Sequence, residues 1–286
     1  MYLIYRLAQI IVRRLPHPMA YYAGMRLADV FFVLDRRGRR AVIANLSRIL
    51  KHQGRTVTQR ELTRMCRRNF ENFGKYLVDF FRFARFQPDQ IGQLVQIENM
   101  EALEQARAHN KGVILVTAHF GNWELGGAVL TTLGYELSAV FQPERARSVN
   151  RLFQQRRAGR GIHGIELGKA ARSVIKVLKN KGMAAMLADR DFSGERATID
   201  FFGAPAHLPS GPARMAQRTG APVVPMFMSH KPDDTFVLRA YPPIIPTANT
   251  TVEDIHRQIR DALEHAINQN PLQWFIFEDF WRDRHE

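Results

Sequence analysis

The pattern of hydrophobic and polar positions changes near residue 95. Before that point, apolar side chains recur every three or four positions, which predicts a helical region over residues 1–88 with a long amphipathic helix over 58–85. After it, short apolar runs alternate with amphipathic segments. Such alternation predicts an α/β fold with a central mixed, largely parallel sheet flanked by helices.

The individual elements follow from the same pattern. We expect strands over residues 113–116, 137–141, 183–187, 198–202, 223–228 and 236–240. Helices are expected near residues 99–110, 123–133, 147–158, 169–181, 210–218 and 250–269. The aromatic residues of the tail, 274–281, are predicted to cap the core rather than to bind a ligand.

The N-terminal region combines apolar helices with arginines. Apolar residues recur at helical spacing over 3–11 and are followed by Arg13 and Arg14, an order opposite to that of a cleaved signal peptide. A second apolar stretch, 28–34, precedes the Arg-rich segment 35–40. We therefore predict a membrane-associating helical region, 1–90, and an α/β domain, 91–286, as one continuous unit. The alternatives are a helix packed on its own core and a solvated charged face.

Composition narrows the class of protein. The chain has 286 residues, and its 41 Lys and Arg residues exceed its 27 Asp and Glu residues by 14. This excess favours a polyanionic partner, which could be nucleic acid, an anionic membrane or a phosphorylated substrate. Cys66 is the one cysteine, which excludes an intrachain disulfide and favours a reducing compartment.

The candidate chemistry lies after the predicted strand 113–116. His119 follows this strand, Gly121 breaks the chain, and Asn122 is suited to cap a helix that begins near residue 123. Glu124 lies in the first turn of that helix, from which its carboxylate can reach back to His119. A carboxylate on one ring nitrogen leaves the other free to act as a base. The alternative is a histidine that only ends a strand.

The segment HFGNWE, residues 119–124, resembles the His-x4-acid motif of glycerolipid acyltransferases. In particular, the chain resembles the bacterial lipid A biosynthesis acyltransferase family, including its phosphatidylinositol mannoside acyltransferase members. The resemblance extends over almost the whole chain in the order of the family's motifs. The matching segments are 39–41 with 45–46, 188–191, 201–203, 209–213, 219–225 and 271–274.

This resemblance implies transfer of a fatty acyl chain from an acyl thioester to a lipid hydroxyl. It implies His119 as the general base and Glu124 as the residue that orients it. The thioester would be carried by acyl carrier protein or coenzyme A as a co-substrate, and we expect no metal and no other cofactor. The acceptor would be a glycolipid or a lipid A-type molecule.

The same resemblance suggests substrate-binding residues. An arginine is expected after the second predicted strand; Arg156, Arg157 and Arg160 are candidates, with Arg157 favoured for contact with an anionic group. A solvated helix end is the alternative. The remaining predicted residues are Asn122, Asp189, Arg190, Gly203 and Gly211.

Two of these residues carry more specific expectations. Asp189 follows strand 183–187, so it should lie at the same sheet edge as His119. A structural role for Asp189 is the alternative. Arg190 stands where many lipid A enzymes have a neutral residue, which favours the mannoside acyltransferase branch.

Location and competing functions complete the predictions. We expect the protein at the cytoplasmic face of the inner membrane, on an anionic surface and without a cleaved signal peptide. An acyl-thioester hydrolase is the main alternative function. A nucleic-acid-binding protein is disfavoured because the arginines are dispersed and no recognisable nucleic-acid-binding motif is present.

Overall fold

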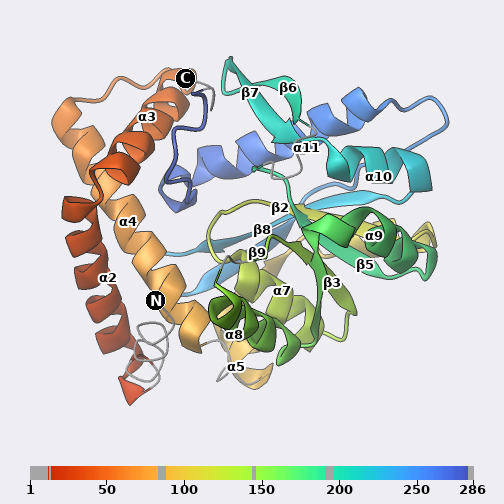
Figure 1. Cartoon of the computed structure of the whole chain (residues 1–286), viewed down its shortest axis with the longest axis horizontal. Coiled ribbons are helices and arrows are strands. Elements are labelled where there is room, and N and C mark those ends of the chain that lie inside the picture. Colours follow the sequence, from red (N-terminus) through yellow and green to blue (C-terminus); the bar gives the residue numbers. More distant parts are fainter. Residues whose placement is uncertain (1–11, 13, 83–87, 144–145, 191–195, 283–286) are drawn as a thin grey trace.

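The computed structural model describes residues 12, 14–82, 88–143, 146–190 and 196–282. A seven-stranded sheet with the order β1-β9-β8-β2-β5-β3-β4 forms the centre of the molecule (Figure 1). All neighbouring strands are parallel except the antiparallel pair β8 and β9. Its strands are β1 (Val95–Glu98), β2 (Val113–Thr117), β3 (Leu137–Phe141), β4 (Ile162–Glu166), β5 (Met183–Leu187), β8 (Val223–His230) and β9 (Phe236–Ala240).

Helices and a separate hairpin surround this sheet. The hairpin consists of β6 (Arg196–Phe201) and β7 (Ala204–Pro209) and is antiparallel. The helices are α2 (His17–Leu34), α3 (Arg36–His52), α4 (Gln59–Arg82), α5 (Pro88–Leu94), α6 (Glu101–Ala108), α7 (Trp123–Thr132), α8 (Arg147–Ala158), α9 (Ala170–Lys179), α10 (Gly211–Thr219) and α11 (Val252–Gln269). Short 3-10 helices are η2 (Leu167–Lys169) and η3 (Pro271–Gln273).

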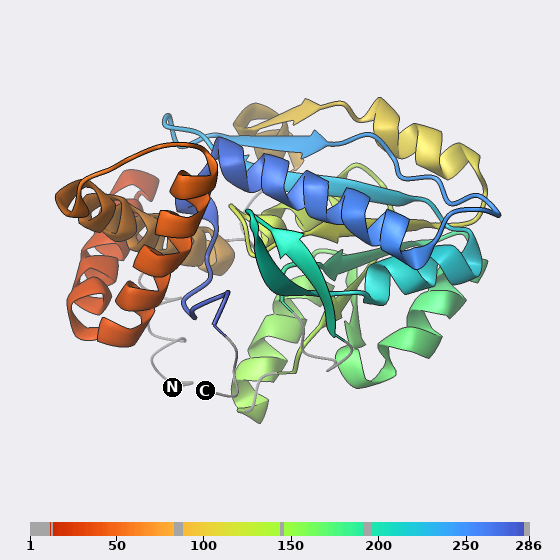
Figure 2. The ribbon, with the colours of Figure 1, turned by 90° about the horizontal axis from the view of Figure 1, so that it is seen from above.

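Side chains of β2 alternate between two hydrophobic layers. Ile114 and Val116 belong to the layer shared with α9, α10 and α11, whereas Val113 and Leu115 belong to the layer shared with α6 and α7. Because both faces of β2 are covered, its residues form a continuous apolar run rather than an alternating one. Figure 2 shows α11 lying across one face of the sheet, with the N-terminal helices at one side.

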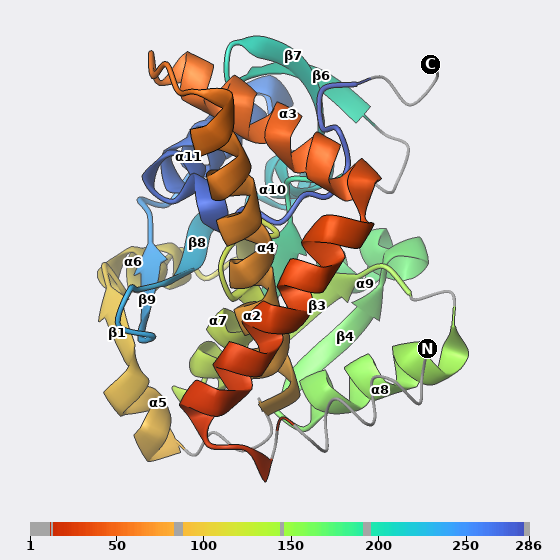
Figure 3. The same cartoon turned by 90° about the vertical axis from the view of Figure 1, so that its left-hand side faces the viewer.

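Helices α2, α3 and α4 form a bundle, in which α2 lies outermost (Figure 3). Helices α2 and α4 meet at two glycines: a Cβ atom on Gly74 would lie 2.6 Å from the carbonyl oxygen of Gly24. A larger residue at either position would push the helix backbones apart. Arg67 of α4 forms a bidentate ion pair with Asp29 of α2, which connects the two helices on their exposed side.

The C-terminal segment lies between this bundle and the sheet. Asn45 of α3 donates to the carbonyls of Ile276 and Glu278, and Asn69 of α4 donates to those of Leu272 and Trp274. Both asparagines are buried, so these bonds satisfy amides that would otherwise be costly. The N-terminal helices therefore hold in place the tail that borders the site described below.

The predicted fold class is confirmed, and six strands form where the sequence predicts them. The strand predicted over 198–202 is part of β6, which pairs with β7 rather than joining the main sheet. Strands β1, β4 and β7 were not predicted. The helix predicted over residues 3–11 lies outside the described residues.

Candidate active site

The register of β2 and β5 brings His119 and Asp189 together. Thr117 of β2 pairs with Leu187 of β5, and the two strands are parallel. His119 and Asp189 each follow two residues later, so they leave the sheet side by side at its carboxyl edge. This is the edge at which open α/β sheets usually place their functional groups.

Asp189 contacts both the ring and the backbone of His119. Its Oδ1 lies 2.9 Å from Nδ1 of the ring, and its Oδ2 accepts the backbone N–H of His119 at 2.8 Å. Trp274 donates its indole N–H to the same Oδ2 at 3.0 Å. Asp189 is fully buried, and the carboxylate therefore has defined partners on both oxygens.

These contacts determine the protonation of the pair. Burial alone would raise the pKa of Asp189, but His119 and the indole N–H together lower that pKa below its ordinary value. Asp189 is thus ionised at neutral pH and can only accept, so Nδ1 of His119 carries the proton. The other ring nitrogen, Nε2, then presents a lone pair, as a general base requires.

The remaining surroundings of His119 hold the ring in place. Phe275 donates its backbone N–H to the carbonyl of His119 at 2.7 Å. The ring of Trp123 meets the imidazole edge-on, with centroids 5.3 Å apart, and stacks on Tyr76. The His119 side chain keeps 17% of its surface exposed, so it is fixed by its neighbours and still reachable.

Glu124 does not make the predicted contact with His119. Both oxygens of Glu124 accept from Nε of Arg157, at 3.0 and 3.2 Å, and Oε1 also accepts from Nη2. The position that Glu124 was expected to fill, on the ring nitrogen of His119, is taken by Asp189. The reason is the register of β2 and β5, which places a carboxylate beside the ring before α7 begins.

Arg157, the arginine favoured for contact with an anionic group, lies beside Glu124. Its guanidinium lies over the ring of Phe141, and its Nε and Nη2 face Glu124 rather than an open surface. Of the three candidate arginines, Arg157 is the one paired with the acid of the His-x4-acid motif. Arg156 is buried and Arg160 is partly buried, so neither is the solvated helix end considered as an alternative.

Asn122 caps α7, as the sequence predicts. Its Oδ1 accepts the backbone N–H of Leu125, and its Nδ2 donates to Asp79 at 3.1 Å. Gly121 has a φ of +56°, and a Cβ atom there would lie 1.8 Å from the carbonyl oxygen of Met228. Asn122 is buried, so it positions the helix that carries Glu124.

The other predicted residues, Arg190, Gly203 and Gly211, differ in their local geometry. Arg190 forms an ion pair with Glu278 of the tail, with Nε 3.0 Å from Oε1. Gly203 adopts a φ of +70° in the turn between β6 and β7, where its N–H is bonded to Asp200, consistent with the expected tight turn. Gly211 instead begins α10 and is absent from the residues described with positive φ.

Trp274 is a site residue that the sequence analysis assigned to the core. It is buried and packs among aromatic residues, as a core residue would, but its indole N–H also binds Asp189. The match of residues 271–274 to a family motif was the available signal. Hydrophobic pattern alone does not separate an indole that packs from one that also donates a hydrogen bond.

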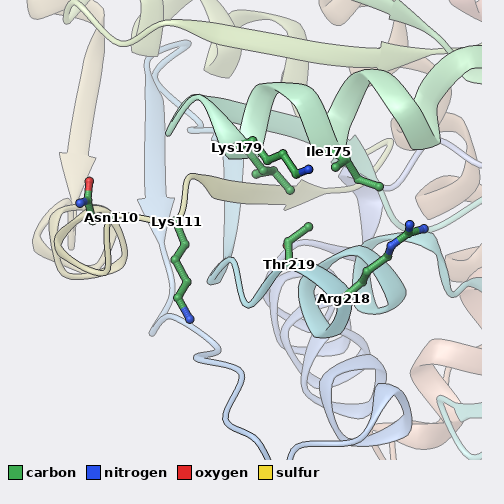
Figure 4. A pocket seen from close by; sticks show the side chains of 7 residues that line it. Asn110, Lys111, Ile175, Lys179, Arg218 and Thr219 are labelled. Atoms are coloured by element: carbon green, nitrogen blue, oxygen red, sulfur yellow. The ribbon is translucent and has the colours of Figure 1, made fainter.

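A cavity of about 510 Å³ lies at the opposite edge of the sheet (Figure 4). Lys111, just before β2, lines it together with Lys179 of α9 and Arg218 of α10. Lys179 and Arg218 lie in the last turns of their helices, where positive charge stabilises the helix dipole. Since His119 follows β2 and Lys111 precedes it, this cavity is separate from the His119 site.

Comparisons with known proteins decide the family. A model of the bacterial lipid A biosynthesis acyltransferases matches residues 1–283. The chain belongs to this family. It is 24% identical to the phosphatidylinositol mannoside acyltransferase of Mycolicibacterium smegmatis, over 95% of this chain and 88% of that protein. It is 25% identical to the lipid A biosynthesis lauroyltransferase of Escherichia coli K12, over 96% of this chain and 89% of that protein.

Among solved structures, the chain is similar to the 1-acyl-sn-glycerophosphate acyltransferase PlsC of Thermotoga maritima. The TM-score is 0.43 and the sequence identity 12%, over 88% of this chain and 96% of that one. Membership of the lipid A biosynthesis acyltransferase family makes the protein an O-acyltransferase. Within the described residues, no group of three or more His, Cys, Asp or Glu side chains is placed to hold a metal ion.

Proposed function

We propose that the protein moves a fatty acyl chain from an acyl thioester to a hydroxyl of a glycolipid or lipid A-type acceptor, at a membrane surface. The observation that carries this proposal is the His119–Asp189 pair in a chain of the acyltransferase family. The pair supplies an oriented base, and the acyl group is supplied by the thioester.

In the proposed reaction, Nε2 of His119 takes the proton of the acceptor hydroxyl. The hydroxyl oxygen attacks the thioester carbonyl carbon, a C–O bond forms and the C–S bond breaks. The sulfur leaves as a thiolate and receives the proton from the imidazolium. Asp189 stabilises the imidazolium while it exists, because its carboxylate is 2.9 Å from Nδ1.

Glu124 and Arg157 have a supporting role in this proposal. Their ion pair joins α7 to α8 and fixes the helix that follows His119. An arginine held by a carboxylate keeps a defined orientation, from which it can also contact an anionic group of the donor or acceptor. Contact with such a group would be in addition to its contact with Glu124.

The donor is an acyl carrier protein or coenzyme A thioester. For the acceptor, the relatives point to two kinds of glycolipid, because one is a phosphatidylinositol mannoside acyltransferase and another is a lauroyltransferase of lipid A biosynthesis. Mass spectrometry of membrane lipids from cells with and without the gene distinguishes the two. Loss of one acyl chain from a single lipid class would name the acceptor.

Helix α2 supports the proposed membrane association. Its exposed large apolar side chains line the helix over more than three turns: Met19, Tyr22, Leu27, Val30, Phe31, Val33 and Leu34, which is 71% exposed. Arg36, Arg37 and Arg40, all exposed, follow directly in α3. An apolar face bordered by arginines is suited to an anionic lipid surface. In the described part of the chain, no helix is both long and apolar enough to cross a membrane.

The location proposed from these features is the cytoplasmic face of the inner membrane. A lipid-vesicle co-sedimentation experiment tests the surface. Phe31→Ser and Leu34→Ser should weaken binding to anionic vesicles, and binding should fall as salt rises. Leu133→Ser is the matched control because Leu133 is 50% exposed outside α2. Equal effects of all three substitutions would reject α2 as the docking face.

The variant His119→Ala tests the catalytic proposal. Loss of the base should lower the rate of lipid-dependent acyl transfer by about 10²–10⁴-fold with little change in Tm. His163→Ala removes an exposed histidine of β4 and should match the wild type. Near-normal transfer by His119→Ala would reject the assignment. Thiol release by the wild type that does not need a lipid acceptor would instead favour a thioester hydrolase.

A further inference from the structure

Asp79 is a fully buried carboxylate of α4 for which the proposed reaction has no use. Its Oδ1 accepts the hydroxyl of Tyr21 of α2 at 2.7 Å, and its Oδ2 accepts Nδ2 of Asn122 at 3.1 Å. His17 of α2 approaches Oδ1 at 3.7 Å. Asp79 therefore joins the outermost N-terminal helix to the residue that caps α7.

The Tyr21 end of this chain belongs to the helix with the exposed apolar face. Tyr21 is 2% exposed, whereas its neighbour Tyr22, about 100° further around the helix, is 62% exposed, so Tyr21 faces the bundle and Tyr22 faces solvent. Burial, and then the Asp79 charge, raise the pKa of Tyr21, which keeps its proton available for Asp79. Nε2 of His230, 3.1 Å from the same hydroxyl oxygen, is then the donor of that contact.

The Asn122 end belongs to the site. Asn122 uses one amide atom for Asp79 and the other for the first turn of α7, so the two bonds share one rigid group. That first turn contains Trp123, which packs against the ring of His119, and Glu124, which binds Arg157. A displacement of Asn122 would therefore change both the packing of Trp123 on His119 and the ion pair of Glu124 with Arg157.

The packing around Asp79 favours passing a displacement of α2 on to Asn122, because the helices have little room to move independently. The backbones of α2 and α4 abut at Gly24 and Gly74, so the helices have little room to slide. Arg82, at the end of α4, donates to the carbonyls of Val12 and Leu15 and so holds the chain that enters α2. Hydrogen bonds in such a dry environment are strong and directional.

We infer that Asp79 is a positioning residue that couples contact of α2 with a lipid surface to the geometry of the His119 site, so that a membrane raises kcat. This inference rests on the proposed acyl transfer. The coupling runs through two hydrogen bonds, Tyr21 to Asp79 and Asn122 to Asp79. Removal of either bond should remove the stimulation by lipid and leave the binding to lipid in place.

Two variants each remove one of these bonds. Tyr21→Phe removes the hydroxyl on the α2 side and keeps the ring. Asn122→Ser keeps an oxygen that can cap α7 but loses the amide that reaches Asp79. Asp29→Asn is the matched control because it weakens the α2–α4 contact at Arg67 without touching Asp79.

The experiment compares kcat on two presentations of the same acceptor. Acyl-coenzyme A is the donor, and a total membrane lipid extract of the source cells is presented either in phosphatidylglycerol-containing vesicles or dispersed in nonionic detergent. We expect vesicles to raise the kcat of the wild type about 10-fold, a typical coupling between sites. Tyr21→Phe and Asn122→Ser should lose this ratio while co-sedimenting with vesicles like the wild type, and Asp29→Asn should keep it.

Three results overturn the inference: a wild type with equal kcat on both presentations, variants that keep the wild-type ratio, or an equal loss of the ratio in Asp29→Asn. A merely structural role of Asp79 would lower Tm and both kcat values together, leaving their ratio unchanged. If the wild type transfers no acyl chain under either presentation, from acyl-coenzyme A or from acyl carrier protein supplied in its place, the proposed function itself has failed.

Discussion

The charged side chains at the two edges of the central sheet differ in their burial and in their partners. At the carboxyl edge, Asp189 and Glu124 are buried, and each is bonded to a cationic or polar partner. At the amino edge, Lys111, Lys179 and Arg218 are exposed around a cavity, and none of the residues described as lining it is acidic. Charges of the first kind hold a defined geometry, whereas charges of the second kind are solvated and screened by salt.

This difference separates a candidate active site from a hollow in the surface. Two cations of the amino-edge cavity, Lys179 and Arg218, stabilise helix ends, and the residues described as lining it include no histidine. The carboxyl edge has one histidine whose ring is oriented and whose second nitrogen is reachable. Substitutions at the two edges should therefore have very different effects on activity.

The largest effect among the acids is expected at Asp189. Asp189→Asn removes the acceptor of the imidazole proton, so the ring loses its defined tautomer, and kcat should fall by about 10²–10⁴-fold. The substitution keeps one oxygen for Trp274 or the backbone of His119. Steady-state kinetics with the lipid acceptor measure the change, and a loss below about threefold would contradict the assigned role.

Asp189 should also affect stability in acid. Its pKa is lowered in the folded protein, so it stabilises the fold fully above the unfolded-chain value, near 4, and loses this contribution as pH falls through the lower folded value. Asp189→Asn should lack this acid-dependent component. Tm measured from pH 6 down to pH 3 gives the comparison, and parallel curves for both proteins would count against the lowered pKa.

An intermediate effect is expected at the ion pair of Glu124 and Arg157. Glu124→Gln removes the negative charge that both Nε and Nη2 of Arg157 face, which should cost about 1–3 kcal/mol of unfolding free energy. The rate should fall by less than in Asp189→Asn, and Arg157→Lys should behave similarly because lysine lacks the planar fork. Glu166→Gln, an exposed position at the end of β4, is the control. If Glu124→Gln lost as much activity as Asp189→Asn at equal Tm, Glu124 would share the orienting role.

A smaller effect is expected at Trp274. Trp274→Phe keeps the aromatic packing but removes the N–H bonded to Asp189, and kcat should fall about 10-fold. Trp281→Phe is a matched control because the indole of Trp281 donates to the carbonyl of Phe201, away from Asp189. Equal losses in both variants would show that packing, rather than the bond to Asp189, explains the effect.

The smallest effect is expected at the amino edge. Lys179→Ala and Arg218→Ala should leave kcat and KM within about twofold of the wild type, because surface substitutions away from special features change little. The same kinetic assay measures them. A large rise in KM for either variant would mean that the amino-edge cavity binds a substrate, which would break the comparison between the two edges.

Much of this arrangement was predictable from the sequence. The apolar runs of β2 and β5 mark strands covered on both faces, and the position of His119 after β2 marks the candidate functional edge. β4 escaped prediction because it is an edge strand with three exposed residues among its five. β7 escaped because its two prolines disfavour a strand in the middle of a sheet, a restriction that does not apply in a two-stranded hairpin.

The partner of His119 was harder to predict than its position. The sequence places Glu124 near His119 along the chain, and Asp189 reaches it through strand register. Register between β2 and β5 depends on the packing of both faces, which the order of residues does not specify by itself. The position of Asp189 after a strand indicated the correct edge, but nothing in the spacing indicated which of the two acids binds the ring.

The central claim is that His119 and Asp189 act as one unit, and a double-mutant cycle on kcat/KM tests it most directly. Residues of one unit are strongly non-additive. On the His119→Ala background, Asp189→Asn should therefore cost almost nothing, although alone it lowers kcat/KM by about 10²–10⁴-fold. A full additional loss in the double variant, equal to that of Asp189→Asn alone, would show that Asp189 acts independently of His119 and would contradict this account.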